Sequence, residues 1–313
     1  IPVYNCAAYL SDTLQSVLVQ DMGEALMQIE VVDDCSTDAD VQALVQQIGG
    51  GRVLYYRQRE NVGSLRNFET CLNRAQGVYV HLLHGDDRVR PGFYQKISSL
   101  FERFPAAGAA FCRYSFIDSN GELIKERFRE ANEDGLLQNW LLRIAERQAI
   151  QFAAMVVRRE VYEKVGSFYG MTHGEDWEMW VRIAKYYPVA YTPELLADYR
   201  THDRSLTWFD LVNGNISTYI DRAINAIQEH VPEKNRKAIL LSVKRYYART
   251  HIAFDQQIWQ KEKNRQLTIK HLEAALNLHK SMRIYFHVLK LYSKMGIERM
   301  ASHEPFPQSE LKH

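Results

Sequence analysis

The sequence predicts an α/β protein in which a mostly parallel sheet is flanked by helices and followed by a helical C-terminal region. Short apolar, β-branched segments alternate with amphipathic segments in the first part of the chain, as in parallel sheets covered on both faces. Acidic residues follow two of the apolar segments, at the strand ends where such sheets bind ligands. Near residue 210 the strand patterns stop and long helical patterns begin.

The composition is typical of a soluble globular protein. The chain has 313 residues, of which 46% are hydrophobic and 25% charged, so it can bury one large core or two smaller ones. Its longest apolar runs, 106–112 and 150–157, are much shorter than the roughly 18 residues that span a bilayer. The four cysteines have no C-x-x-C spacing, which argues against a zinc site or a disulfide framework. We expect reduced thiols in a cytoplasmic protein.

The N-terminal elements follow from the hydrophobic periodicity. Ile1–Asn5 is predicted to be the end of a strand whose first part is missing. Residues 7–20 form a helix, because apolar side chains recur there at i, i+4, i+7 and i+8. The elements that follow are a strand within 28–38, a helix at 41–48, a strand at 53–56, a helix at 64–75 and a strand at 78–83.

The C-terminal region is predicted to be helical and basic. Helical patterns cover 212–229, 233–260 and 266–295, with breaks at Pro232 and Lys261–Asn264. From residue 211 onward 17 Lys and Arg face 9 Asp and Glu, a net charge of +8, which leaves −7 for residues 1–210. We therefore divide the chain into an α/β domain at 1–210 and a helical region at 211–313. The basic side chains fit solvated helix faces, a membrane surface or a partner.

Three acidic clusters are candidate functional residues. They are Asp33–Asp34, Asp86–Asp87 and Glu175–Asp176. Each one alone fits a structural turn or a helix cap, but three clusters at strand and helix ends are harder to explain in that way. Adjacent carboxylates repel each other unless a positive group lies between them. A divalent cation that bridges a substrate diphosphate would supply that charge, since hard cations bind carboxylate and phosphate oxygens together.

Five ordered segments carry a family resemblance. They are IPVYNCAAYLSDTLQSVLVQD, EVVDDCSTD, ENVGSLRNFETCLNRAQGVYVHLLHGDD, GEDWEMWVRIA and YRTHDRSLT. The chain over roughly 1–207 resembles bacterial, inverting family 2 glycosyltransferases of the GT-A fold. The resemblance implies a GT-A catalytic domain and a metal-dependent, inverting hexosyltransferase that uses Mn²⁺ or Mg²⁺. It does not extend to the helical region.

The resemblance also assigns residues to the nucleotide-sugar site. Pro2 and Tyr4 match positions that line the base pocket, and Asp34 matches an acceptor for the base or ribose. Arg66 matches a basic residue that reaches the base or the phosphates, with a surface helix arginine as the alternative.

Further positions match the metal and the diphosphate. Asp86 matches the metal-coordinating acid of the family's D-x-D motif, and Asp87 the acid that supports the sugar or the metal shell. The first acid of that motif is replaced here by His84, which either donates to a ribose hydroxyl or is merely a strand-end histidine. His202 matches a position that holds the metal or the diphosphate, and Arg200 and Ser205 offer further donors to the phosphates.

The transfer step needs a base opposite the leaving group, because the acceptor hydroxyl loses a proton as it attacks. By resemblance this base is Asp176, with Glu175 orienting the acceptor or its loop and Trp177 packing beside the sugar. An acidic helix start stabilised by the helix dipole is a compatible structural explanation.

The resemblance implies a UDP- or dTDP-sugar donor and a saccharide or lipid-linked saccharide acceptor, in surface polysaccharide synthesis. The acceptor site is expected from residues 113–154 and part of the tail. Two alternatives stay open: a nucleotidyltransferase, and a non-catalytic carbohydrate-binding protein on a decayed GT-A core. We expect no nucleic-acid partner, a cytoplasmic location, and either peripheral contact with the inner membrane face or a homo-oligomer through the C-terminal helices.

Overall fold

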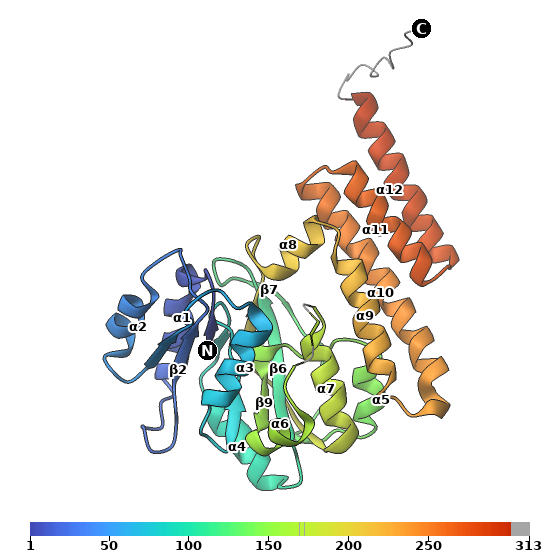
Figure 1. Cartoon of the computed structure of the whole chain (residues 1–313). Helices are drawn as coiled ribbons and strands as arrows, with labels where there is room; N and C mark the ends of the chain where they lie inside the picture. The colour runs from blue at the N-terminus through green and yellow to red at the C-terminus, as the bar shows by residue number, and fades with distance from the viewer. Residues whose placement is uncertain (169, 172, 302–313) are drawn as a thin grey trace.

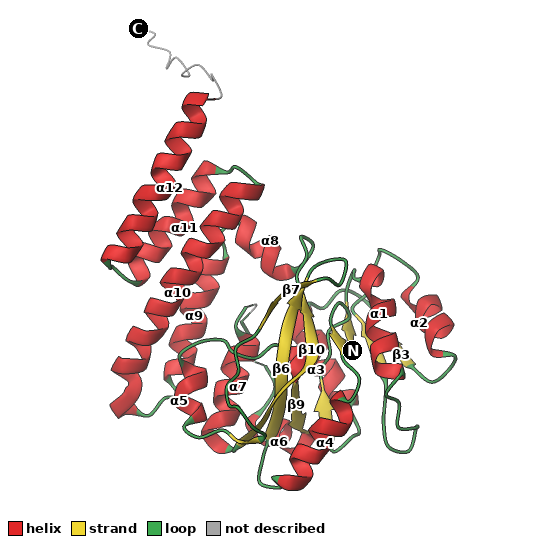
Figure 2. Ribbon diagram, turned by 180° about the vertical axis from the view of Figure 1, so that it is seen from behind, coloured by secondary structure: helices red, strands yellow, loops and turns green. Residues whose placement is uncertain are grey.

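A computed structural model describes residues 1–168, 170–171 and 173–301, with side chains through residue 296. It confirms the predicted fold class: strands and flanking helices form one body, and a group of helices follows it (Figures 1 and 2). The last part of the predicted helical region, residues 302–313, lies outside the described residues.

The strands form two sheets. In the first, β1, β2 and β3 lie side by side in parallel. In the second, the order is β4-β9-β6-β10-β5, with β7 added to β6 and β8 to β10. The strands are β1 Pro2–Val3, β2 Glu30–Asp33, β3 Leu54–Arg57, β4 Tyr79–His81, β5 Arg88–Val89, β6 Ala109–Ile117, β7 Leu123–Glu126, β8 Gly135–Leu136, β9 Met155–Arg158 and β10 Val189–Arg200.

The pairing is more mixed than the alternating pattern indicated. The first sheet is parallel, and so is the long β6–β10 pair at the centre of the second. The other pairs of the second sheet are antiparallel. One reason lies in the connections, since β6 and β7 are joined by a tight turn at Asp118–Gly121, and a short hairpin can join only antiparallel strands.

The two sheets meet at Gly85, just after β4. The Gly85 backbone N–H donates to the Pro2 carbonyl oxygen over 3.1 Å. A Cβ atom at this position would lie 2.8 Å from Val3 Cγ2 and 2.9 Å from Cys6 Sγ, so no larger residue fits without displacing β1. This close approach places the acids that follow Gly85 beside the ends of β1 and β2.

The three helices predicted at 7–20, 41–48 and 64–75 are found close to those bounds, as α1, α2 and α3. Asp40 caps α2 by accepting from the Ala43 N–H over 3.0 Å, and Gly50 ends the helix in the left-handed conformation. The helices before residue 205 are α1 Ala7–Leu18, α2 Val41–Gly49, α3 Ser64–Arg74, α4 Phe93–Arg103, α5 Trp140–Ala145, α6 Arg159–Val165 and α7 Glu175–Tyr186, with the 3-10 turn η1 at Phe152–Ala154.

The C-terminal helices are α8 Leu206–Val212, α9 Ile216–Gln228, α10 Glu233–Lys261, α11 Arg265–Leu278 and α12 Met282–Ala301. The predicted breaks at Pro232 and Lys261–Asn264 are confirmed. The prediction of one helix over 266–295 is wrong, because His279 is extended and α12 folds back onto α10 and α11. The predicted start at 212 is also wrong, since Gly214 has a φ of 69° and α9 begins after it.

The hydrophobic core continues from the sheets into the C-terminal helices. Ile220 and Ile224 of α9 and Val243 of α10 belong to the same buried cluster as the strands and α7. A second, smaller cluster joins the rest of α10 to α11 and α12. The domain boundary at residue 210 therefore falls inside α8 and beside a shared core, and it stays a prediction. All four cysteines are free, and among the described helices none combines the length and apolarity of a membrane span.

Candidate active site

Asp86 and Asp87 lie in the turn between β4 and β5, and each has a hydrogen-bond partner at or just after the end of β10. His202 Nε2 is 3.0 Å from Asp86 Oδ2. Burial alone would raise the pKa of Asp86, but the bond to His202 holds that pKa below its ordinary value. Asp87 is 1% exposed and accepts from the Arg200 backbone N–H over 2.8 Å. Burial and the adjacent Asp86 charge raise its pKa.

Arg200 ties this turn to the N-terminal part of the chain. Its Nε donates to the Asp86 carbonyl oxygen over 2.7 Å, and its guanidinium forms an ion pair with Asp12 of α1. Thr13, also on α1, donates to the Asp87 carbonyl oxygen over 2.7 Å. Arg200 thus holds the acidic turn in place, while Ser205, another predicted phosphate donor, caps α8 by accepting from the Trp208 N–H.

His84 joins the two acids in one cluster. Ligand atoms of His84, Asp86 and Asp87 all lie within 4.8 Å of one another. The His84 ring packs against Phe68 and Phe152, with centroid distances of 4.9 and 4.4 Å. Burial lowers its pKa to about 4, so the ring is neutral at pH 7. Its Nε2 is buried and has no hydrogen-bond partner among the described residues, which suits an unprotonated ligand nitrogen.

The predicted nucleotide side is arranged around the ends of β1 and β2. Tyr4 is 51% exposed, whereas Pro2 is buried and its carbonyl oxygen is taken by Gly85. Both Asp34 carboxylate oxygens accept backbone N–H groups, from Val62 over 2.8 Å and Gly63 over 3.0 Å. Asp34 therefore fixes the loop before α3 in this structure.

Two neighbours complete this side. Arg66 is exposed on the first half of α3. Asp33, which sequence reasoning left without a role, is fully buried and binds Tyr55 over 2.7 Å and Arg57 over 2.5 Å. It joins β2 to β3 beneath the predicted base pocket.

The third acidic cluster starts α7, as the sequence predicted. Gly174 caps the helix with a φ of 83°. Asp176 Oδ1 accepts from the Trp177 N–H over 2.6 Å, and Oδ2 accepts from the side-chain amide of Gln148. Burial raises the pKa of Asp176 to about 7 in spite of these donors. A carboxylate with that pKa can take up a proton near neutral pH.

Trp177 differs from what the resemblance implied, and the role of Glu175 stays a prediction. Burial, followed by the charge of Asp176, raises the pKa of Glu175 well above its ordinary value, and its Oε2 is buried without a partner. Trp177 is 1% exposed, and its indole N–H donates to the Ile144 carbonyl oxygen over 2.6 Å. The prediction that Trp177 packs beside the sugar does not fit this position, because the ring fills the core behind Asp176.

Sequence reasoning missed the groups that surround Asp176. Gln148 comes from the loop after α5, and Tyr247 of α10 packs on Trp177 with ring centroids 5.2 Å apart. Burial and the charge of Asp176 raise the pKa of the Tyr247 hydroxyl, and a hydrogen bond with the backbone of Gln148 lowers it. Burial, together with the charges of Asp87, Asp86 and Asp176, raises the pKa of Tyr199 of β10. No local motif marks these residues, because they meet only in the folded chain.

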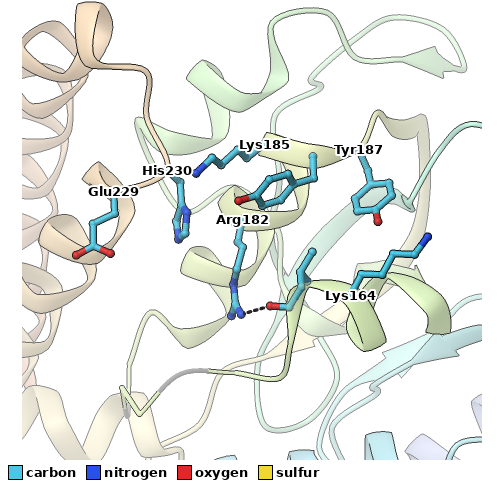
Figure 3. Close-up of a pocket in the computed structure, with 8 residues that line it drawn as sticks. Lys164, Arg182, Lys185, Tyr187, Glu229 and His230 are labelled. Atoms are coloured by element: carbon cyan, nitrogen blue, oxygen red, sulfur yellow. Dashed lines mark hydrogen bonds between the residues drawn. The ribbon is translucent and has the colours of Figure 1, made fainter.

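A separate hollow is lined by none of these acids. It measures about 560 Å³ and is lined by the end of α7 and the end of α9 (Figure 3). Arg182 and Lys185 come from the second half of α7, whereas Asp176 is at its start. Next to the hollow, buried Glu178 binds Arg182 over 2.8 Å and His230 over 2.7 Å. We interpret this region as the packing contact between α7 and the end of α9.

Comparisons with known proteins agree on one family. The model of the family described as "Glycosyl transferase family 2" matches residues 1–166. An uncharacterized protein of Mycobacterium tuberculosis is 30% identical over 224 residues, which are 63% of this chain and 64% of that protein, less than two thirds of its length. The putative teichuronic acid biosynthesis glycosyltransferase TuaG of Bacillus subtilis is 28% identical, covering 66% of this chain and 79% of its own.

Solved structures share the fold. The crystal structure of Staphylococcus aureus TarS, residues 1–349, in complex with UDP-GlcNAc superposes with a TM-score of 0.62 at 14% identity. The superposition covers 87% of this chain and 77% of that one.

Proposed function

The chain belongs to glycosyl transferase family 2, and on that premise we propose that it transfers a hexosyl group, with inversion, from a UDP- or dTDP-sugar to a saccharide or lipid-linked acceptor. The observation that carries the proposal is the contrast between the two acidic clusters, Asp86–Asp87 and Glu175–Asp176. Asp86 is paired with His202 and is ionised, whereas Asp176 has a pKa of about 7. The Asp86–Asp87 cluster suits the binding of a cation and a diphosphate, and the Glu175–Asp176 cluster suits the uptake of a proton.

A divalent metal, Mn²⁺ or Mg²⁺, fits the first cluster. Asp86 Oδ2 and His202 Nε2 are 3.0 Å apart, close to the separation of about 3 Å between neighbouring ligands with bonds of about 2.1 Å. The unpartnered Nε2 of His84 is a further nitrogen donor. Asp86 and His202 would hold the ion with His84 beside them, while one oxygen of Asp87 accepts from the Arg200 backbone N–H. A bound ion neutralises charge on the leaving diphosphate.

The side chains of the second cluster would carry the proton transfer. Asp176 takes the proton from the acceptor hydroxyl as that oxygen attacks the anomeric carbon from the face opposite the diphosphate. Gln148 and the Trp177 N–H fix both carboxylate oxygens, so the basic lone pair keeps one direction. Glu175, whose pKa is raised well above its ordinary value by burial and by the charge of Asp176, would orient the acceptor by hydrogen bonding.

The nucleotide would lie between β1, the loop fixed by Asp34 and Arg66 of α3. Tyr4 is exposed there and can stack on a base. The relatives support the direction of the proposal: TuaG is named for teichuronic acid biosynthesis, GgaB of Bacillus subtilis for minor teichoic acid biosynthesis, and one TarS structure holds UDP-GlcNAc. We propose that this chain likewise works in surface polysaccharide synthesis, on the cytoplasmic side.

The test is a donor and product assay. The chain is screened for thermal stabilisation by UDP, dTDP and GDP, with Mn²⁺ and with EDTA. Stabilisation by UDP or dTDP that requires Mn²⁺ supports the donor and metal assignments, and equal stabilisation in EDTA contradicts the metal. Product analysis by NMR then identifies a glycoside of inverted configuration. Release of diphosphate with formation of a nucleotide-sugar would instead identify a nucleotidyltransferase, and binding without turnover a non-catalytic protein.

A further inference from the structure

Helix α12 has two apolar faces, and only one of them is packed. Ile284, Val288 and Leu291 are 1–9% exposed and close the second core cluster against α10 and α11. On the other face Met282 is 84% exposed, Leu289 67% and Phe286 65%. Large apolar side chains at such exposure usually occur singly on a protein surface, and a contiguous group marks an interaction site.

The exposed side chains form one stripe. At 100° per residue, Met282, Phe286 and Leu289 fall on one side of the helix, with Tyr285 and Tyr292 at its edge. The tyrosines are 42% and 41% exposed. We name these five residues the α12 stripe. The helix lies on the outside of the C-terminal helical group, away from the sheets (Figures 1 and 2).

A basic row borders the α12 stripe. Arg283, Lys290 and Lys294 are all exposed and lie about 100° around the helix from Met282. Between this row and α10 there is a hollow of about 210 Å³. Its lining combines amines, amides and rings from the two helices: Gln256, Trp259, Gln260, His287, Lys290, Leu291 and Lys294.

We propose that α12 docks on an anionic lipid surface, with the α12 stripe at the boundary of headgroups and acyl chains. The basic row then faces the phosphates, and the hollow beside Lys290 and Lys294 receives a lipid headgroup. Apolar burial combined with attraction to anionic lipid is how amphipathic helices bind in the interface plane. Exposed tyrosines at the edge of the stripe suit the same depth, where one end of the ring is apolar and the other wet.

The charge pattern favours lipid over a second copy of the chain. Two α12 helices packed face to face and antiparallel would place their basic rows along the same edge, where like charges repel. An anionic surface has the complementary sign along the whole row. The inference goes beyond the proposed function, because it concerns the surface on which the enzyme works, whatever its donor. Docking would bring a lipid-linked acceptor within reach.

The experiment is vesicle flotation of the full chain. We expect flotation with phosphatidylcholine vesicles that contain phosphatidylglycerol, little with phosphatidylcholine alone, and a decrease at high salt. The double variant Phe286→Ser/Leu289→Ser should reduce the bound fraction roughly tenfold or more, and so should Lys290→Glu/Lys294→Glu. The matched controls, Leu26→Ser and Lys237→Glu, change an exposed apolar side chain and an exposed lysine elsewhere, and should float like the unmodified chain.

Three outcomes would overturn the proposal. They are unchanged flotation of both α12 variants, equal binding to neutral and anionic vesicles, and an absence of binding at low salt. Light scattering provides a fourth: a dimer that only the α12 variants disrupt, without vesicle binding, would assign the stripe to a second copy. UDP-induced stabilisation measured on the same variants keeps this test separate from the proposed function, since α12 lies far along the chain from the nucleotide side.

Discussion

The two acid pairs contain similar side chains in different surroundings. Asp86 and Asp87 receive His202 and Arg200 from the end of β10. Glu175 and Asp176, at the start of α7, receive only an amide and a backbone N–H, and one Glu175 oxygen has no partner. In the first pair the hydrogen bond with His202 offsets burial and holds the pKa of Asp86 below its ordinary value, whereas the pKa of Asp87 is raised. In the second pair burial prevails and both pKa values rise.

This difference indicates that the hydrogen-bonding and charged groups around a buried acid determine its role more than its residue type does. Asp86 keeps its charge at low pH and suits a permanent cation. Asp176 is poised to exchange a proton near neutral pH. The predictions below test that division of roles, starting with the largest expected effect.

Asp176→Asn should lower glycosyl transfer by on the order of 10² to 10⁴, because the amide keeps the shape of the side chain but has no basic oxygen. UDP binding should survive, since the residue lies outside the first cluster. Steady-state rates and UDP titrations measure the two effects. Glu175→Gln is the matched comparison and should lose less, because an amide can still form the hydrogen bond proposed to orient the acceptor. Near-normal turnover of Asp176→Asn would refute the role of base.

Asp86→Ala should weaken Mn²⁺-dependent UDP binding by at least about tenfold, the usual scale of a damaged metal site. The fold should persist, because the side chain is 25% exposed in a turn. Calorimetric titration of UDP with Mn²⁺ and with EDTA measures the change. Asp203→Ala, an exposed acid beside His202, is the control. If both variants lose affinity equally, general surface charge and not a metal site is responsible.

Gln148→Leu should shift the pH profile of the reaction upward. In the unmodified enzyme the rate should rise through about pH 7 as Asp176 loses its proton. Gln148 donates to the charged form, and a hydrogen bond of roughly 1.5 kcal/mol corresponds to about one pH unit. The variant should therefore be several-fold slower at pH 7 and recover at pH 9. A loss that higher pH does not rescue would indicate a structural defect instead.

Asp255 of α10 extends the comparison to a buried acid whose two oxygens have no hydrogen-bond partner. Burial raises its pKa to about 9. Between the unfolded value near 4 and 9, the folded state keeps a proton that the unfolded state has lost, so stability falls as pH rises. Asp255→Asn removes this dependence. Its melting temperature should exceed that of the unmodified chain by a few degrees at pH 8 and by less at pH 5. A constant difference across this range would contradict the raised pKa.

The sequence predicted the parts of the fold that depend on local pattern. The elements from α1 to β4 appear within a few residues of their predicted bounds, because their periodicity and caps are local. The long strands β6 and β10 were not predicted, since Ala109–Ile117 is buried on both faces and lacks alternation. The break between α11 and α12 was missed because packing of Ile284 and Val288 on α10, a tertiary effect, favours the turn.

The residues of the candidate site were also predicted only in part. Asp86, His202 and Asp176 could be placed by motif, and the fold brings Asp86 and His202 to 3.0 Å. Gln148 and Tyr247 could not, because they reach Asp176 from loops and helices that share no motif with it. Trp177 was expected at the sugar, but nothing in GEDWEMW distinguishes a ring on the pocket side from one in the core. Side-chain direction at a helix start depends on what packs against it.

The core shared by α7, α9 and α10 has a consequence for how such a gene can change. A recombination event at the codons near residue 210 would separate Leu211, Ile220 and Val243 from the buried surface they cover. The new partner would have to supply helices of the same shape, or leave apolar surface exposed to water. Exchange of whole C-terminal segments between related genes is therefore disfavoured, and the helices beside the candidate base are inherited together with the sheet that carries the nucleotide side.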